Sequence, residues 1–426
     1  MGKNDDVKDK LDNTSSKDDP ISLSEVEKLA HDRLPKAVYD YYACGADDQD
    51  ALKRNIDAYS RIYILPRVLR DVSTVDTTTK IFDWTTSIPI AFAPSAMQKL
   101  AGGDGELDVG RTAAKLGLNM TLSSQSTTSL EDVMDAAKRE AAIGDCSPKF
   151  WFQIYLTPDM DHNIALITRA EGIINPSEIK SRIMLIELPI IAAGYEALAI
   201  TVDTPVLGNR LNERKTPLVL PKHLRLPNVE DISKPKSNKP TVNRLLMDAR
   251  TAKQAEEILD RARNTTHSSA LTWDVVATLR KSTTMKIILK GIMTPEDARL
   301  AVKHGVDAIV VSNHGGRQLD CVPSTLEALP DIAAAVEHRI PVIFDGGIRK
   351  GADVFKAIAL GADLVLIGRP VVWGLGYKGQ EGLETVVNIL ERELSRTMAL
   401  AGVTKVADIK AGSLGIARSS FGFSRL

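Results

Sequence analysis

Residues 312–320, "SNHGGRQLD", place a histidine, two glycines and an arginine directly after the apolar run "VDAIVV". The imidazole of His314 titrates near neutral pH, so it suits a general base. The planar guanidinium of Arg317 can bind a carboxylate through two parallel hydrogen bonds. The stretch therefore predicts either a solvated turn between a strand and a helix or a catalytic base beside an anion-binding arginine.

Further polar residues end other apolar runs. Asp203 ends "ALAITVD" and could hold the second ring nitrogen of the histidine, which would stabilise the imidazolium. Lys290 ends "IILK", where a buried ammonium needs an anionic partner or serves a developing negative charge. Arg210 is a second candidate for carboxylate binding, so the set fits removal of a proton beside a carboxylate. Tyr41 and Tyr155 could donate hydrogen bonds to a substrate oxygen, although tyrosines in a helical stretch such as "VYDYY" mostly pack.

The elements that must position these residues alternate along the chain. Short β-rich runs are separated by amphipathic helical stretches, several of which close on glycine. The eight runs are "IPIAFAPSAM", "NMTLSSQS", "FWFQIYL", "ALAITVDTP", "KIILKGI", "AIVVSNHGG", "PVIFDGGI" and "LVLIGRP". Runs that are apolar on both faces suit a parallel sheet covered by helices, so eight units indicate an α/β fold of the (β/α)8 TIM barrel type. The competing fold, a doubly wound open sheet, would not need a polar residue at nearly every strand end.

Two loops late in the chain combine glycine with arginine, "IFDGGIRKG" and "IGRP". Adjacent glycines let backbone amides approach a ligand closely, and Arg349 and Arg369 add positive charge. In a TIM barrel the loops after strands seven and eight form the usual phosphate site. We therefore expect a phosphate-bearing cofactor or substrate at these loops.

The rest of the chain divides into a tail, a helical segment and the barrel. Residues 1–20 are charged, contain no aromatic residue and predict a disordered tail, and residues 21–426 form one domain. "LSEVEKLAHDRLPKAVYDYYACGADD" is helical, with Ser24 and Glu27 at capping-box spacing. Residues 206–270, after the fourth run, predict a long loop that acts as a lid or is partly disordered.

Composition and the C-terminus restrict the partners. The 54 Lys and Arg residues nearly balance the 55 Asp and Glu residues, which argues against nucleic acid. The 3 cysteines lack metal-type spacing and indicate a reducing compartment without disulfides or a metal site. The longest apolar stretch, "IMLIELPIIAAG", is too short to span a membrane. The final Ser-Arg-Leu resembles the peroxisomal address Ser-Lys-Leu, so we expect a peroxisomal protein, with a cytoplasmic location as the alternative.

From about residue 22 onward the chain resembles the FMN-dependent 2-hydroxy acid oxidases and dehydrogenases, which include glycolate oxidase and the flavin domain of L-lactate dehydrogenases. "SNHGGRQLD" is the signature of that family, and "LPKAVYDYYACGADD", "APSAMQKLA", "TVDTPVLGNR", "ILKGI", "DGGIRKG" and "IGRPVVWG" match it in order. The resemblance implies FMN as cofactor and oxidation of an L-2-hydroxy acid to the 2-oxo acid. It also implies a homo-oligomer, commonly a tetramer.

The resemblance further implies a role for each matched position. His314 would take the hydroxyl proton, or the alpha proton if a carbanion forms first, and Asp203 would support it. Tyr155 would bind the hydroxyl or keto oxygen, and Lys290 would lie against the flavin N1–C2=O region, where reduction places negative charge. The substrate carboxylate would be bound by Tyr41, Arg210 and Arg317. The other residues expected to bind FMN are Pro94, Ser95, Ala96, Ser123, Gln153, Thr201, Ser312, Asp345, Gly346, Gly347, Arg349, Gly368 and Arg369.

Two positions depart from the family pattern. Gln125, in "SSQSTT", stands where glycolate oxidase has an aromatic residue that walls the substrate pocket, so a larger or more polar acid than glycolate is expected. Val206 replaces a basic residue of some members. The leader is too short for a haem domain, so oxygen is the expected acceptor, with hydrogen peroxide as product. Open alternatives are a dehydrogenase with another acceptor, an oxidase that tailors a specialised metabolite, and a catalytically inactive FMN-binding or structural protein.

An insertion near residues 171–191, "EGIINPSEIKSRIMLIELPII", has no counterpart in the family pattern. It is either a surface elaboration away from the active face or a retained intron in a conceptual translation. The apolar "IMLIELPII" would be hard to leave exposed, which favours the second interpretation.

Overall fold

The computed structural model describes residues 19–142, 148–172, 193–230, 268–417 and 423–425, together with 245, 251, 253–254 and 257–258. The expected disordered tail lies outside the described residues except for its last two positions. Most of the expected insertion and the polar part of the long loop, 231–244, also lie outside them. The interpretations of these segments therefore stay predictions.

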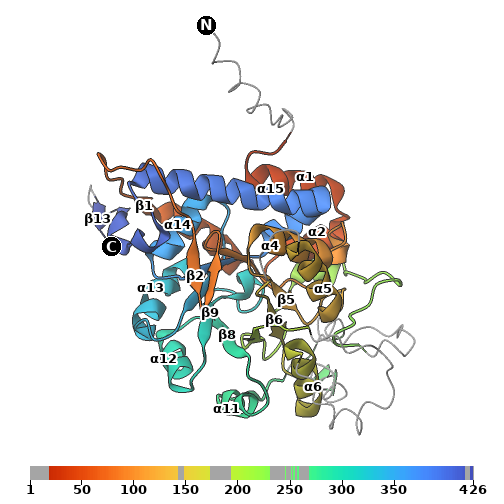
Figure 1. Cartoon of the computed structure of the whole chain (residues 1–426). Helices are drawn as coiled ribbons and strands as arrows, with labels where there is room; N and C mark the ends of the chain where they lie inside the picture. Colours follow the sequence, from red (N-terminus) through yellow and green to blue (C-terminus); the bar gives the residue numbers. More distant parts are fainter. Residues whose placement is uncertain are drawn as a thin grey trace.

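Eight parallel strands form the centre of the molecule (Figure 1). They are β4 (Ile90–Phe92), β5 (Thr121–Ser123), β6 (Trp151–Ile154), β7 (Ala197–Thr201), β8 (Lys286–Ile292), β9 (Ala308–Val311), β10 (Val342–Asp345) and β11 (Leu364–Ile367). The sheet order is β4-β11-β10-β9-β8-β7-β6-β5, and a parallel bridge between Phe92 and Met120 joins its two edges. The sheet is thus closed, which confirms the predicted TIM barrel.

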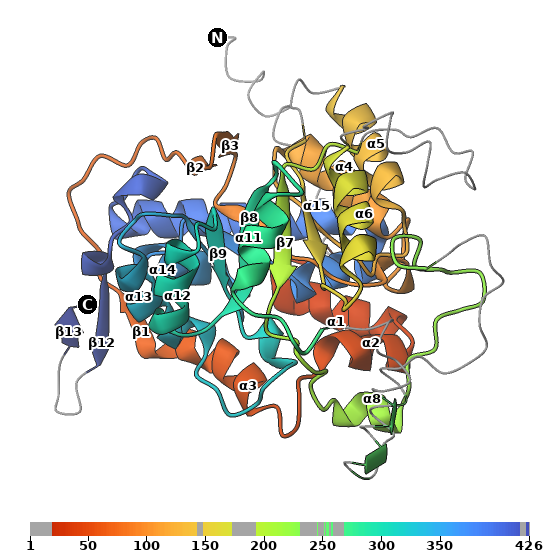
Figure 2. The same cartoon turned by 90° about the horizontal axis from the view of Figure 1, so that it is seen from below.

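Helices surround the strands, because each strand is buried on both faces and needs a cover. They are α4 (Glu106–Leu116), α5 (Leu130–Ala141), α6 (Met160–Glu171), α11 (Asp274–Arg280), α12 (Pro295–Lys303), α13 (Thr325–Val336), α14 (Gly351–Ala359) and α15 (Arg369–Ala401). Figure 2 shows α12, α13 and α14 on one side of the strands and α4, α5 and α6 on the other. Within the described ranges, no helix combines the length and apolar character that crossing a bilayer requires.

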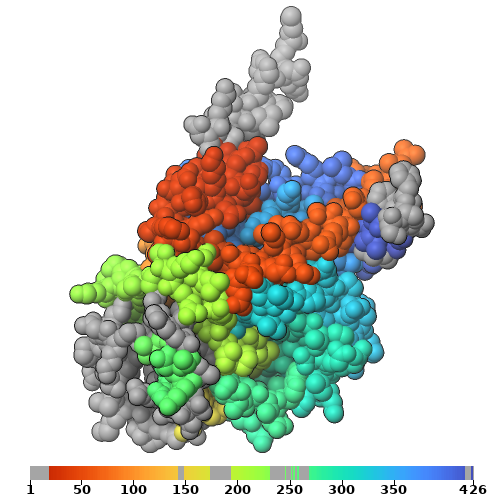
Figure 3. All heavy atoms as spheres, turned by 180° about the vertical axis from the view of Figure 1, so that it is seen from behind, coloured from red at the N-terminus to blue at the C-terminus, as the bar shows by residue number. Residues whose placement is uncertain are grey.

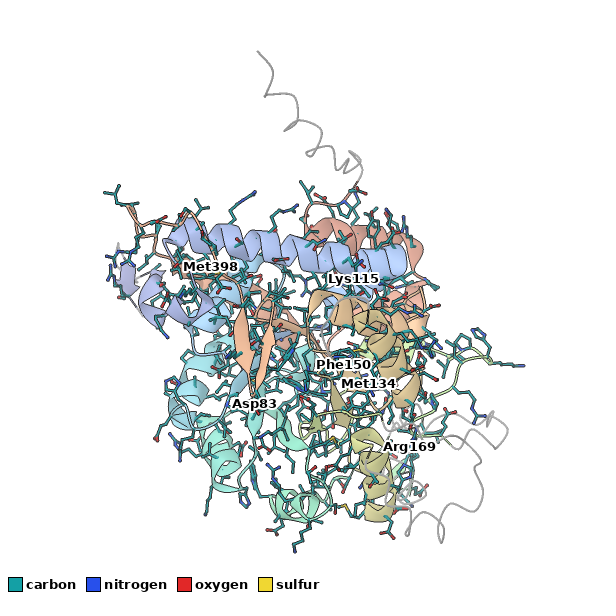
Figure 4. All side chains as sticks on the ribbon, in the orientation of Figure 1. Asp83, Lys115, Met134, Phe150, Arg169 and Met398 are labelled. Atoms are coloured by element: carbon teal, nitrogen blue, oxygen red, sulfur yellow. The ribbon has the colours of Figure 1, made fainter. Side chains whose placement is uncertain are left out.

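Ion pairs tie neighbouring outer helices together. Arg169 of α6 donates two hydrogen bonds, of 2.9 and 2.8 Å, to the carboxylate of Glu131 in α5. Lys115 of α4 contacts Glu384 of α15 at 2.8 Å. Figure 4 labels Lys115 near α15, Arg169 on α6, and Phe150 nearer the middle of the molecule, where Phe150 is fully buried. These surface pairs add little stability by themselves, so the apolar layer beneath them holds the helices.

A short hairpin closes the N-terminal end of the barrel. It consists of β2 (Thr79–Ile81) and β3 (Trp84–Thr86), with Asp83 at its tip (Figure 4). Ile81 is buried with the barrel's inner side chains, and the ring of Phe82 lies edge-on to that of Trp151, 6.0 Å away. Many inner positions are alanine, such as Ala199, which leaves room for the large rings. Buried side chains therefore fill the barrel toward the hairpin, and the opposite, C-terminal end is where a TIM barrel places its functional residues.

The N-terminal helices lie at that open end. They are α1 (Leu23–Arg33), α2 (Lys36–Ala43) and α3 (Asp50–Asp57), and α1 packs along α15 (Figure 1). The capping prediction was wrong by two residues, because Ser22, not Ser24, accepts a hydrogen bond from the amide of Glu25 and begins α1. Ser22 and Glu25 have the same spacing as Ser24 and Glu27, so the motif alone could not choose between them.

Two further segments complete the described structure. Strand β1 (Ile62–Ile64) pairs with β12 (Leu414–Ala417), which pairs with β13 (Phe423–Arg425) near the C-terminus. The loop after β7 contains the short helix α8 (Leu211–Lys215), which the sequence did not predict. Figure 3 shows this loop in yellow-green against the N-terminal helices in red. Asn212 donates a hydrogen bond to the sulfur of Cys44 at 2.6 Å, and Asn209 donates one to Asp47 at 2.6 Å.

Candidate active site

His314 stands between an acid and a phenol at the open end of the barrel. Its Nδ1 lies 3.0 Å from Oδ1 of Asp203, which follows β7, and its Nε2 lies 3.4 Å from the hydroxyl of Tyr155, which follows β6. The rings of His314 and Tyr155 are nearly parallel, with an interplanar angle of 18°. His314 has a φ of 58°, a left-handed conformation that a bulky residue adopts only where its surroundings hold it. The backbone is therefore shaped to present this side chain.

The surroundings keep the imidazole neutral. Burial lowers the pKa of His314 below its ordinary value, and although the Asp203 carboxylate acts to raise it, Lys290 and Arg210 act with burial to lower it. Burial raises the pKa of Asp203, but His314 and Lys290 outweigh it and hold that pKa below its usual range. Burial also raises the pKa of the Tyr155 phenol well above its ordinary value. At neutral pH the site holds a neutral base, an ionised carboxylate and a phenol that can donate a hydrogen bond.

Lys290 brings a positive charge into the wall of the same opening. It lies in β8, is only 5% exposed, and donates a hydrogen bond to the Ser312 hydroxyl at 3.0 Å. Its ammonium is 3.5 Å from Oδ2 of Asp345, the last residue of β10. The hydroxyl of Ser312 also accepts a bond from the backbone amide of His314 at 3.1 Å. Lys290, Ser312 and the histidine are thus one hydrogen-bonded unit.

Two arginines approach each other beside the histidine. Nη1 of Arg210 lies 3.2 Å and Nη2 of Arg317 lies 3.4 Å from Oε1 of the buried Glu213. Arg317 also donates hydrogen bonds to the carbonyl oxygens of Tyr41 and Cys44. Its guanidinium carbon is 4.8 Å from the centre of the Tyr41 ring. The structure therefore brings Tyr41 and both predicted carboxylate-binding arginines together.

Arg369, in the glycine and arginine loop after β11, lies close enough to Arg349 of the loop after β10 for their charges to interact. Arg369 is held by the carbonyl oxygens of Tyr42, Gly315 and Cys44, at 2.8, 3.0 and 3.2 Å. Among the described residues, no carboxylate lies within ion-pair distance of Arg369. Burial and the nearby cations Arg317 and Arg349 lower the pKa of Arg369 to about 9. A buried cation without a counter-ion is a place for an anion such as a phosphate.

Three further residues predicted to bind FMN lie in the loops after β10 and β11: Gly347, Arg349 and Gly368. The Arg349 side chain lies 3.9 Å from Glu27 of α1 and donates to the carbonyl oxygen of Ile348 at 2.9 Å. Gly347 has a φ of 75°, and a Cβ there would lie 1.8 Å from the carbonyl oxygen of Asn55. Only glycine fits this close approach. Gly368 caps the start of α15 directly before Arg369.

Buried acceptors lacking a donor show that the opening suits a flavin. Gln153 donates to the hydroxyl of Thr201 at 2.9 Å, but its buried Oε1 has no donor among the described residues. The buried Oδ1 of Asp345 likewise has none. Such atoms are costly unless a ligand supplies the missing donors. The ring N–H and ribityl hydroxyls of FMN are donors of this kind, and its phosphate is the anion that Arg369 lacks, so the residues fit the cofactor.

The remaining predicted residues lie on the first two strand ends. Pro94, Ser95 and Ala96 follow β4, and the Tyr42 hydroxyl donates to the carbonyl oxygen of Ala96 at 2.8 Å. Ser123 ends β5, and its hydroxyl accepts a bond from the amide of Gln125 at 3.1 Å. The carbonyl oxygen of Gln125 accepts a bond from the amide of Met97 at 3.2 Å. Gln125 therefore adjoins the segment after β4.

Sequence reasoning missed the residues that hold the functional ones in place. Gln318 clamps the loop after β7, because its amide donates to the carbonyl oxygens of Asp203 and Val206 and accepts from the amide of Gly208. Asn55 and Asn313 exchange two side-chain hydrogen bonds of 2.8 and 2.9 Å. Gln318 directly follows Arg317 in "SNHGGRQLD", and this place inside the motif was the sequence feature that could have identified it.

Comparisons with known proteins agree with this geometry. A family model described as FMN-dependent dehydrogenase matches residues 30–174 and 186–415. The 2-hydroxyacid oxidase of Dictyostelium discoideum is 42% identical over 396 residues, which cover 93% of this chain and 90% of that protein. Glycolate oxidase of Spinacia oleracea is 42% identical over 388 residues, 91% and 94% of the two chains. A crystal structure of mandelate oxidase with 3,3-difluoro-2-hydroxy-3-phenylpropionic acid is similar at a TM-score of 0.73 and 34% identity, covering 92% of this chain and 98% of that chain.

These matches assign the class of protein. The chain belongs to the FMN-dependent dehydrogenase family. It is an oxidoreductase that uses FMN to oxidise the CH–OH group of 2-hydroxy acids, as the resemblance implied. The predicted fold, cofactor and type of reaction are thereby confirmed.

Proposed function

We propose that the neutral imidazole of His314 removes a proton from the 2-hydroxy acid substrate. The observation that carries this proposal is the contact of 3.0 Å between His314 Nδ1 and the Asp203 carboxylate. That contact leaves Nε2 as the proton acceptor, and the negative charge of Asp203 stabilises the imidazolium that forms. Tyr155, which keeps its proton, donates a hydrogen bond to the substrate oxygen as it becomes a carbonyl.

Arg210 and Arg317 bind the substrate carboxylate, and Tyr41 completes that contact. Lys290 would lie against the cofactor ring, where its positive charge would counter the negative charge that reduction places there. Gln153, Thr201, Ser123 and the backbone of residues 94–96 would hold the ring, while the loops after β10 and β11 would hold the ribityl chain and phosphate. FMN held by these residues would supply the two-electron oxidant, and reoxidation by oxygen would give hydrogen peroxide.

The substrate is an L-2-hydroxy acid larger or more polar than glycolate. Gln125 supports this proposal, because by the resemblance it stands at the position where glycolate oxidase has an aromatic residue that walls the substrate pocket. The C-terminal Ser-Arg-Leu supports import into peroxisomes, where peroxide is handled. The protein acts as a homo-oligomer, as the resemblance to its family implies.

One experiment tests the proposal as a whole. Glycolate, L-lactate, a long-chain L-2-hydroxy acid and L-mandelate are added in turn to the purified yellow protein under argon, and the visible spectrum is followed before air is admitted. We expect one of the larger acids to bleach the flavin fastest, with rapid return of colour in air. Slow return of colour would assign another electron acceptor. Bleaching by none of the acids would contradict the proposed function.

The pH dependence of flavin reduction follows from the base. Protonated His314 cannot accept a proton, so the rate constant at saturating substrate is expected to fall as the pH falls through the pKa of His314, below the ordinary 6.5. Asp203→Asn removes the charge that raises this pKa, so the fall in rate on the acid side of the pH profile moves to lower pH. The maximal rate also falls about 100-fold, because the imidazolium is less stable without that charge. Stopped-flow absorbance from pH 4.5 to 8 measures both. If the acid side of the pH profile is the same in Asp203→Asn as in wild type, the pair of His314 and Asp203 is not the source of the pH dependence.

Side-chain preference should respond to the residue at position 125. Gln125→Trp restores an aromatic wall, so the ratio of kcat/KM for glycolate to kcat/KM for L-mandelate is expected to rise about tenfold. Gln318 contacts the loop after β7 rather than position 125. Gln318→Glu should therefore lower kcat/KM for glycolate and for L-mandelate without changing their ratio. Steady-state peroxide formation measures these parameters. An unchanged ratio in Gln125→Trp would show that position 125 does not select the substrate.

A further inference from the structure

Glu213 occupies a place among the substrate-binding residues that the proposed reaction does not require. It lies in the short helix α8, and its side chain is 8% exposed. One of its oxygens, Oε1, lies 3.2 Å from Arg210 Nη1 and 3.4 Å from Arg317 Nη2. Among the described residues, it is the only carboxylate within ion-pair distance of either guanidinium. Glu213 thus serves both arginines at once.

Two buried guanidinium groups at one place repel each other. Burial and the charge of Arg210 lower the pKa of Arg317, whereas the charge of Glu213 opposes that effect. With Glu213 ionised, the cluster of two arginines and one carboxylate carries one net positive charge. A substrate with a single carboxylate neutralises that charge, whereas a dianion leaves a net negative charge in a buried place.

Glu213 also holds the two arginines in position. Arg210 directly precedes α8 and Glu213 follows it by three residues, a spacing that brings helical side chains together. Arg317 comes from the loop after β9, where Nη1 is already held by the carbonyl oxygens of Tyr41 and Cys44. Because Glu213 is bonded to Nη1 of Arg210 and Nη2 of Arg317, it fixes the two planes relative to each other.

We propose that Glu213 is a positioning residue that sets the charge and the orientation of the Arg210–Arg317 pair, and that it makes the enzyme selective for 2-hydroxy monocarboxylic acids over dicarboxylic acids. This inference rests on the proposed role of the two arginines in binding the substrate carboxylate. This inference specifies how many carboxylates the substrate carries, whereas the proposal for Gln125 specifies only the size and polarity of its side chain.

The test compares two non-reacting anions on the FMN-loaded enzyme. Propionate carries one charge and oxalate two, and their dissociation constants are read from the change they cause in the oxidised flavin spectrum, without turnover. Glu213→Gln removes one negative charge, so both anions bind more tightly. The free-energy gain for oxalate is twice that for propionate, so a gain of about threefold for propionate accompanies about ninefold for oxalate. At saturating L-lactate, flavin reduction slows because the guanidinium planes are no longer fixed.

A matched control lies in the same loop. Glu230 pairs with Arg225 at 3.1 Å rather than with the substrate-binding arginines. Glu230→Gln makes the same change of net charge, and it should leave both dissociation constants within twofold of wild type. Glu213→Asp keeps the charge but shortens the side chain, so it should slow flavin reduction while the ratio of the two dissociation constants stays at the wild-type value.

The outcomes separate this inference from the proposed function. Equal or weaker binding of both anions in Glu213→Gln would overturn the role of Glu213. If Glu213→Gln does not retain FMN, the test rests on Glu213→Asp, which keeps the charge. A ratio of oxalate to propionate affinity that differs from wild type in Glu213→Asp would overturn the inference. Arg210→Lys tests the proposed function itself. Unchanged anion binding and an unchanged KM for L-lactate in Arg210→Lys would show that the arginines do not bind the substrate carboxylate.

Discussion

Replacing His314 by glutamine is expected to slow reduction of the flavin by its best substrate about 10³- to 10⁴-fold. Glutamine retains hydrogen-bonding capacity near Asp203 but cannot accept a proton at neutral pH. FMN content should stay at the wild-type level, because the residues proposed to hold the cofactor are untouched. Anaerobic stopped-flow absorbance measures the rate constant, and the ratio of flavin to protein absorbance measures the content.

His304→Gln is the matched control for this prediction. His304 stacks on Trp273 with ring centroids 5.3 Å apart, at the end of α12, and takes no part in the site. The rate of flavin reduction in His304→Gln should equal that of wild type. A His314→Gln enzyme that reduces its flavin within tenfold of the wild-type rate would remove His314 from the proposed role of base.

Replacing Lys290 by methionine should slow flavin reduction about 10²- to 10³-fold, the usual effect of removing one preorganised charge from a reacting centre. Methionine has nearly the same length but no charge, so Asp345 loses the ammonium that lies 3.5 Å from it. The reduced flavin loses the same stabilisation. Its two-electron midpoint potential should therefore fall by about 60 mV, which corresponds to a hundredfold change in the equilibrium.

A redox titration of Lys290→Met under argon measures this potential independently of the rate. Lys290→Arg keeps the charge and should retain most of the wild-type potential, although its larger head group will disturb the bond to Ser312. A wild-type potential in Lys290→Met would place the ammonium away from the reducible ring. The proposed role of Lys290 would then fail, while that of His314 would stand.

The barrel and most of the site could be predicted because each depends on local patterns. Strands buried on both faces read as short apolar runs, and their parallel arrangement brings the residues that follow them to one end. Asp203, Lys290 and His314 are 87 and 24 residues apart in sequence, yet Asp203 and His314 come shortly after β7 and β9, and Lys290 lies in the last half of β8. Their meeting therefore required only the order of the strands. The precise start of α1 could not be predicted, because Ser22 and Ser24 offer the same local capping pattern.

The sequence alone determined the fold, the FMN-dependent chemistry and the residues that face the opening. Tertiary structure alone decided which side chains hold those residues: Glu213 between two arginines, Asn55 against Asn313, and the hairpin residue Phe82 against Trp151. The physical reason is that these contacts join positions 69 to 258 residues apart, or depend on a short helix in a loop, and none of them leaves a periodic trace in the chain. A periodic pattern records which face of an element is buried, whereas a hydrogen bond between distant loops is recorded only in their packing.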